Sequence, residues 1–121
     1  MNYRHKFFPD TSIEAWLAAH HEDDVYEENL AMLIAVLEID FQIPIPEIPG
    51  YLERLLNIMI SKGARPVSLD DEKQWVARNE FGANPNEIAT NLMLDWVSSG
   101  HPKYEHDFGP IWLIGPHKGG I

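Results

Sequence analysis

The sequence predicts a mainly α fold: a single globular domain, residues 1–121, forming a bundle of about five helices with a short irregular or strand-like C-terminal segment. Apolar residues recur at helical intervals through most of the chain, and residues typical of helix caps precede several of these runs. A length of 121 residues with 45% hydrophobic content suits one ordinary core, whereas two domains would each be too small.

The first helix is expected over about residues 12–20. Thr11 stands three residues before Glu14, which is the spacing of a capping box, and Ile13 and Leu17 then fall on one face. The start of this helix is therefore assigned to Thr11.

A second, longer helix is expected over about 25–40. Asp24 stands three residues before Glu27, which repeats the capping signal and favours carboxylates in the first turn. An apolar stripe then follows at helical intervals: Tyr26, Leu30, Leu33, Leu37 and Phe41.

The stretch "IPIPEIPG" at 43–50 is expected to be an extended connector, because proline lacks an amide donor and restricts the residue before it. A third helix follows at about 51–63 and ends at Gly63. The stretch "SLDDEKQWVARNEFG" predicts a fourth helix over about 68–82, capped by Ser68.

The fifth helix, about 84–100, has the clearest signals. Asn84 is the expected cap, Pro85 occupies the first position, Glu87 stands three residues after the cap, and Gly100 stops the helix. The run from 111 to 114 lies between Gly-Pro pairs, and it either forms a small edge strand or packs irregularly on the bundle.

Charge is distributed unevenly along the chain. The net charge is −10, and the residues from Asp10 to Glu53 include eleven acids and no lysine or arginine. The rest of the chain, 54–121, holds eight acids and seven bases. Such a negative front half repels nucleic acid and anionic membranes, so direct binding of either is not expected. It suits docking of a basic protein, and the competing interpretation is a solvated face that keeps the protein soluble.

No complete catalytic constellation is present. The chain has no cysteine, no His-Glu-x-x-His and no Gly-x-Ser-x-Gly, and "GPHKGG" lacks the following helix that a phosphate loop needs. We therefore expect no enzymatic activity, no cofactor and no metal ion. A small metal-dependent enzyme stays open as an alternative, because several histidines could converge if the tail folds back: His20, His21, His101, His106 and His117.

The N-terminus "MNYRHKFFPD" lacks the apolar segment and cleavage site of a secretory signal, and no apolar run reaches the roughly 18 residues of a membrane span. The expected location is the cytoplasm.

The stretches "HHEDDVYEEN" and "LEIDFQIPIPEIP", with the acidity and helical character of the chain, resemble the bacterial immunity proteins of contact-dependent-inhibition and bacteriocin toxin systems. This resemblance implies a cytoplasmic inhibitor of one basic toxin, often a nuclease. An alternative is a nucleic-acid mimic that inhibits a DNA-processing or defence enzyme. The expected partner-binding residues are charged positions and aromatic anchors: Glu22, Asp23, Asp24, Glu27, Glu28, Glu38, Asp40 and Glu47, with Tyr26, Tyr104 and Trp112.

Overall fold

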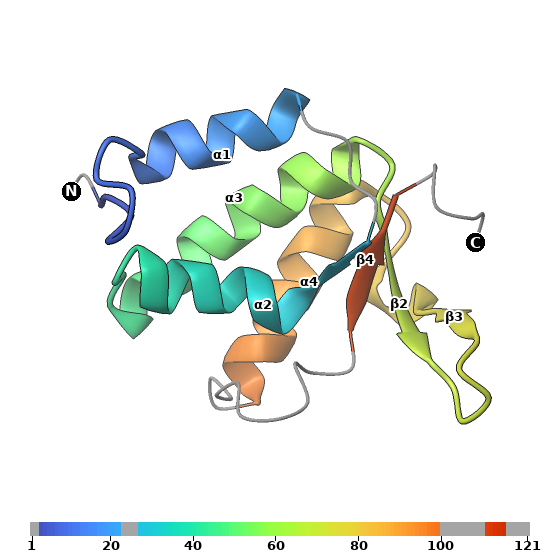
Figure 1. Cartoon of the computed structure of the whole chain (residues 1–121). Coiled ribbons are helices and arrows are strands. Elements are labelled where there is room, and N and C mark those ends of the chain that lie inside the picture. The colour runs from blue at the N-terminus through green and yellow to red at the C-terminus, as the bar shows by residue number, and fades with distance from the viewer. Residues whose placement is uncertain (1–2, 23–26, 100–110, 116–121) are drawn as a thin grey trace.

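A computed structural model describes residues 3–22, 27–99 and 111–115 of the chain. Helices lie against one face of a small sheet (Figure 1). The helical elements are α1 (Ile13–Glu22), α2 (Leu30–Ala35), the π-helix η1 (Val36–Asp40), the 3-10 helices η2 (Ile45–Glu47) and η3 (Asn79–Phe81), α3 (Ile48–Ser61) and α4 (Pro85–Ser98). The strands are β1 (Glu27–Asn29), β2 (Arg65–Leu69), β3 (Trp75–Ala77) and β4 (Trp112–Ile114).

The fold is mixed α/β, and the prediction of a mainly α bundle of five helices is wrong. The four strands form one antiparallel sheet in the order β1-β4-β2-β3. The strand-like run at the C-terminal end is confirmed as β4, but β4 occupies a central position, paired with β1 on one side and β2 on the other.

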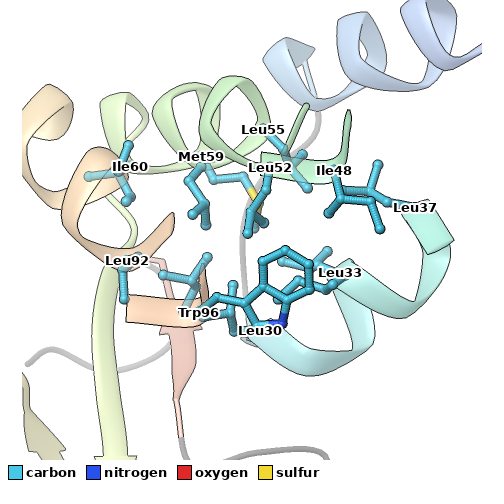
Figure 2. Packing of buried hydrophobic residues seen from close by; sticks show 14 of the residues in the cluster. Leu30, Leu33, Leu37, Ile48, Leu52, Leu55, Met59, Ile60, Leu92 and Trp96 are labelled. Carbon is cyan, nitrogen blue, oxygen red and sulfur yellow. The ribbon is translucent and has the colours of Figure 1, made fainter. Parts of the chain in front are cut away.

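The core lies between the helices and the inner face of the sheet. Figure 2 shows Leu52, Leu55 and Met59 of α3 above the indole of Trp96 from α4, with Leu33 of α2 beside it. Leu113 of β4 belongs to the same buried cluster, which ties the sheet to the helices. Deleting such a fully buried leucine typically costs about 2–5 kcal/mol of stability.

Three of the predicted helices are confirmed, with changes at their ends. α1 begins at Ile13, close to the expected position. Ser12 rather than Thr11 caps it, because the Ser12 hydroxyl accepts from the Ala15 amide at 3.1 Å. α3 begins at Ile48, earlier than predicted. Pro49 lies in its first turn, where backbone amides have no partner within the helix, so the missing N–H of proline costs no hydrogen bond.

The predicted helix 25–40 is only partly correct. Residues Glu27–Asn29 form a strand, and α2 begins after Asn29, whose side chain accepts from the Met32 amide at 3.2 Å. Asn29 therefore caps this helix, where the sequence had suggested Asp24. The helix then widens into the π-helix η1, which ends at Asp40, and Gln42 just beyond it has a left-handed φ of 55°.

The predicted fourth helix, 68–82, is wrong. These residues form the hairpin of β2 and β3, followed by η3. The Asp70 carboxylate accepts from the amides of Glu72 and Gln74, both at 2.9 Å, and Lys73 has a φ of 63°. Asp70 thus closes a tight turn instead of starting a helix.

None of the helices in the described ranges is long and apolar enough to cross a membrane.

Candidate functional site

The acidic pair Glu27 and Glu28 lies on β1, an edge strand of the sheet. Both side chains are exposed, and Glu27 and Glu28 stand opposite Ile114 and Leu113 of β4. Successive residues of a strand point to opposite faces, so the two carboxylates flank the edge from both sides. Within the described part of the chain, neither carboxylate forms an ion pair. The pair, here called the β1 acids, is exposed on this edge of the described sheet.

Of the other residues predicted near this pair, Glu22 is exposed at the last position of α1. Asp23, Asp24, Tyr26 and Tyr104 lie outside the described residues. Their predicted contacts with a partner stay predictions.

A second acidic group, formed by Glu38, Asp40 and Glu47, lies apart from the β1 acids. The helical stretch from α2 through η1 separates them; at about 1.5 Å per residue it spans roughly 15 Å. The structure therefore divides the predicted acidic surface into two groups.

The second acidic group is largely committed to the N-terminal segment. The Tyr3 hydroxyl donates to the Glu47 carboxylate at 2.5 Å, and this hydrogen bond raises the pKa of Tyr3 to about 12. The Lys6 amide donates to the Asp40 carbonyl at 2.8 Å, while His5 Nε2 lies 3.4 Å from the Asp40 carboxylate. Glu38 is half-buried. Glu47 and Asp40 therefore contact the N-terminal segment, whereas the β1 acids have no ion pair in the described part of the chain.

Another acid of the front half is also paired. The Arg54 guanidinium donates to both Glu14 carboxylate oxygens, at 3.0 and 2.6 Å, and these hydrogen bonds lower the pKa of Glu14. The long base-free stretch of sequence is therefore partly neutralised by a residue that follows it directly.

Trp112, the predicted aromatic anchor, is half-buried on the outer face of the sheet. Its ring packs against Trp75 of β3, with centroids 5.7 Å apart and the planes at 62°. Val67 and Ile114 share this face and are buried, although they do not belong to the core cluster beneath the helices. The sequence had placed Trp75 in the predicted helix 68–82, whereas it lies on β3 of the hairpin.

The N-terminal loop presents two exposed aromatic rings that sequence reasoning missed. Phe7 and Phe8 are 67% and 66% exposed, more than any other large apolar side chain described. His5 Nδ1 accepts from both of their amides, at 3.1 and 3.3 Å, which fixes the loop and places the ring proton on Nε2, toward Asp40. The adjacent phenylalanines followed by proline were the available signal.

A pocket of about 760 Å³ lies between the hairpin and the start of α4, with Arg65 and Arg78 in its wall. Arg65 donates to the carbonyls of Ile60 and Ala64, and Arg78 pairs with Glu80. Because both guanidinium groups already have partners, the pocket is not a prepared anion site.

Among the described residues, no three His, Asp or Glu side chains converge as a metal site would require. His20 Nδ1 is engaged by the Trp16 carbonyl at 2.7 Å, an interaction within α1. His101, His106 and His117 lie outside the described residues, so the metal-enzyme alternative is not decided.

Searches for similar proteins found no matching family model, curated protein or solved structure.

Proposed function

We propose that this protein is a cytoplasmic immunity protein without enzymatic activity, which binds a basic toxin domain, most simply a nuclease, and neutralises it. The observation that carries the proposal is the exposed, unpaired position of Glu27 and Glu28 on an edge strand of the described structure. The net charge of −10 and the resemblance to immunity proteins point in the same direction.

For electrostatic capture of a cationic partner, carboxylates without an internal partner matter more than the total number of acids. Glu14, Asp40 and Glu47 have partners within the chain, so a cationic partner would have to compete for them. No such competitor for the β1 acids lies among the residues that the structure describes. Complementary potentials raise association rates toward about 10⁸–10⁹ M⁻¹s⁻¹ at low salt, which suits an inhibitor that must reach its toxin quickly.

The competing explanation is that charges on an edge strand only prevent sheets from joining edge to edge. The two explanations differ in the sign of charge that they require. Lysine protects an edge strand as well as glutamate does, whereas capture of a cationic partner needs a negative charge.

The first experiment is affinity capture from the native host with three baits: the wild-type chain, Glu27→Lys with Glu28→Lys, and Asp71→Lys with Glu72→Lys. Asp71 and Glu72 are exposed neighbours in the turn between β2 and β3, away from β1. Each double reversal changes the net charge from −10 to −6, since each substitution adds two charges. The second variant therefore controls for total charge.

We expect the wild type and the turn variant to retain a basic toxin domain that the β1 variant loses. Equal capture by all three baits would exclude the β1 acids from the interface. Capture of a DNA-processing enzyme in place of a toxin would favour the nucleic-acid-mimic alternative. Far-UV circular dichroism of each bait verifies that the fold is retained.

A further inference from the structure

The two edge strands of the sheet, β1 and β3, differ in how well they are protected against pairing with another strand. The β1 edge carries Glu27 and Glu28, whereas β3 consists of Trp75, Val76 and Ala77, with no charge and no proline. Natural proteins usually guard an open edge with charges, prolines or bulges, because it presents free backbone groups to other strands. The unguarded β3 edge is therefore the better candidate for association.

The hydrogen bonds of the hairpin show which groups β3 presents. The Asp70 amide donates to the Gln74 carbonyl, and the Arg78 amide donates to the Pro66 carbonyl, both at 3.0 Å. Antiparallel strands alternate, so the even-numbered residues of β3 bond to β2. The N–H and C=O groups of Trp75 and Ala77 consequently point outward, and they have no hydrogen-bond partner among the described residues.

We propose that the β3 edge pairs with the β3 edge of a second copy of this chain, joining two sheets into one around a two-fold axis. In the antiparallel register centred on Val76, Trp75 lies opposite Ala77 of the copy and exchanges both backbone hydrogen bonds with it. The two-fold axis supplies the same exchange a second time. All the outward groups of β3 are then satisfied.

The side chain at the centre of this register suits the pairing. Val76 is 43% exposed, and it would face the same residue of the copy at a non-hydrogen-bonded position, where opposing side chains come closest. Each valine would bury apolar surface that it now exposes to water. A β-branched pair is favourable at such a position.

Charge favours this edge as the meeting point of two acidic chains. β3 lies in the half of the sequence that is close to charge balance, with eight acids and seven bases, and Lys73 and Arg78 flank it closely. Approach through the front half would set eleven acids of one copy against those of the other. Because β3 is short, the interface is small and the dimer is expected to be weak.

The test measures the molecular mass by sedimentation at protein concentrations from about 10 μM to about 1 mM, where weak complexes dissociate. The variants are Val76→Lys, which sets two ammonium groups against each other at the axis, and Ile39→Lys as the control. Ile39 is a similarly exposed aliphatic residue, 49%, on η1. We expect the wild type and Ile39→Lys to form dimers and Val76→Lys to dissociate at least tenfold more readily, with unchanged unfolding midpoints.

Hydrogen exchange supplies a second readout that does not depend on a substitution. The Trp75 and Ala77 amides should exchange quickly in dilute protein and become protected as the concentration rises. The Val76 amide, bonded within the hairpin, should be protected throughout. A monomer at every concentration, or a dimer that leaves the Trp75 and Ala77 amides unprotected, would overturn the proposal.

Discussion

At the residue scale, the phenol of Tyr3 forms a hydrogen bond within the chain to Glu47, an acid of the front half. Its hydroxyl donates to Glu47, and this bond raises the Tyr3 pKa to about 12. Because the protonated phenol is the form that bonds, its stabilisation is fully present below the ordinary tyrosine pKa of about 10. It is lost as the pH rises from there through about 12.

The first prediction is that Glu47→Gln lowers the Tyr3 pKa toward its ordinary value, because the amide carries no charge to disfavour the phenolate. Absorbance of ionised tyrosine against pH measures this, and the difference between each protein and its Tyr3→Phe form isolates Tyr3 from the other tyrosines. An unchanged Tyr3 titration in Glu47→Gln would mean that the hydrogen bond is absent in solution.

At this scale, the sequence predicts well those properties that depend on a residue itself or on its close neighbours along the chain. The exposure of Glu27 and Glu28 follows from their charge, and it was expected although the strand beneath them was not. The pairing of Tyr3 with Glu47 joins positions 44 residues apart. No pattern in the sequence indicates that contact, so the engagement of Glu47 by the N-terminal segment was not expected.

At the element scale, α4 is the helix that the sequence describes best. Asn84 accepts from the Glu87 amide at 2.9 Å, which confirms the predicted cap, and the Glu87 carboxylate accepts from the amide of Ala83, the residue before the cap, at 2.9 Å. Each of these interactions lies within a few residues along the chain. Short-range chemistry alone is sufficient to specify them.

The second prediction concerns this cap. Asn84→Ala should lower the free energy of unfolding by about 0.5–2 kcal/mol, because it leaves the Glu87 amide without its acceptor. Asn79→Ala makes the same chemical change at an exposed residue of η3 that caps no helix, and it should have a smaller effect. Urea denaturation of both variants provides the comparison; equal losses would contradict the capping role.

The β2–β3 hairpin was missed because its turn looks like a helix start. In "SLDDEKQW", Ser68 followed by acidic residues resembles a cap and a first helical turn. The deciding feature is the side chain of Asp70, which bonds forward to two amides and closes the turn. Both outcomes use the same residue types, and the pairing of β2 with the distant β4, which also accompanies the hairpin, leaves no local signal.

The third prediction is that Asp70→Ala destabilises the protein by about 1 kcal/mol, since the amides of Glu72 and Gln74 lose their shared acceptor. Asp71→Ala removes an equally charged, exposed neighbour that makes no such bond, so it should be close to neutral. The measurement is again the free energy of unfolding in urea. A neutral Asp70→Ala would show that the turn does not depend on this side chain.

At the scale of the whole molecule, the fold class was wrong because the sheet is assembled from distant segments. β4 lies near the C-terminal end, yet it pairs with β1 from the front of the chain and with β2 from the middle. Three of the four strands are only three residues long, too short for an alternating pattern to be recognised. The apolar stripes of α3 and α4 were long enough to be recognised.

The proposed function also depends on the arrangement of charge over the whole molecule. The Arg54 guanidinium neutralises Glu14, so this acid contributes little to the field that a partner meets. Glu47 keeps its negative charge, because the Tyr3 phenol that donates to it is uncharged. Among the described acids, the β1 acids have a defined position on the edge of the sheet. Steering by these two carboxylates is the central claim.

The most direct test uses the partner that affinity capture retains, which we propose to be a toxin domain. Stopped flow measures the association rate of this purified partner with the protein over about 20 mM to about 500 mM salt, where screening changes most. For Glu27→Lys with Glu28→Lys, we predict at least a tenfold slower rate at low salt and a shallower salt dependence. The turn variant Asp71→Lys with Glu72→Lys, of equal net charge, should stay close to wild type. If the two variants have the same rates across the salt series, the β1 acids do not guide binding, and the account is contradicted.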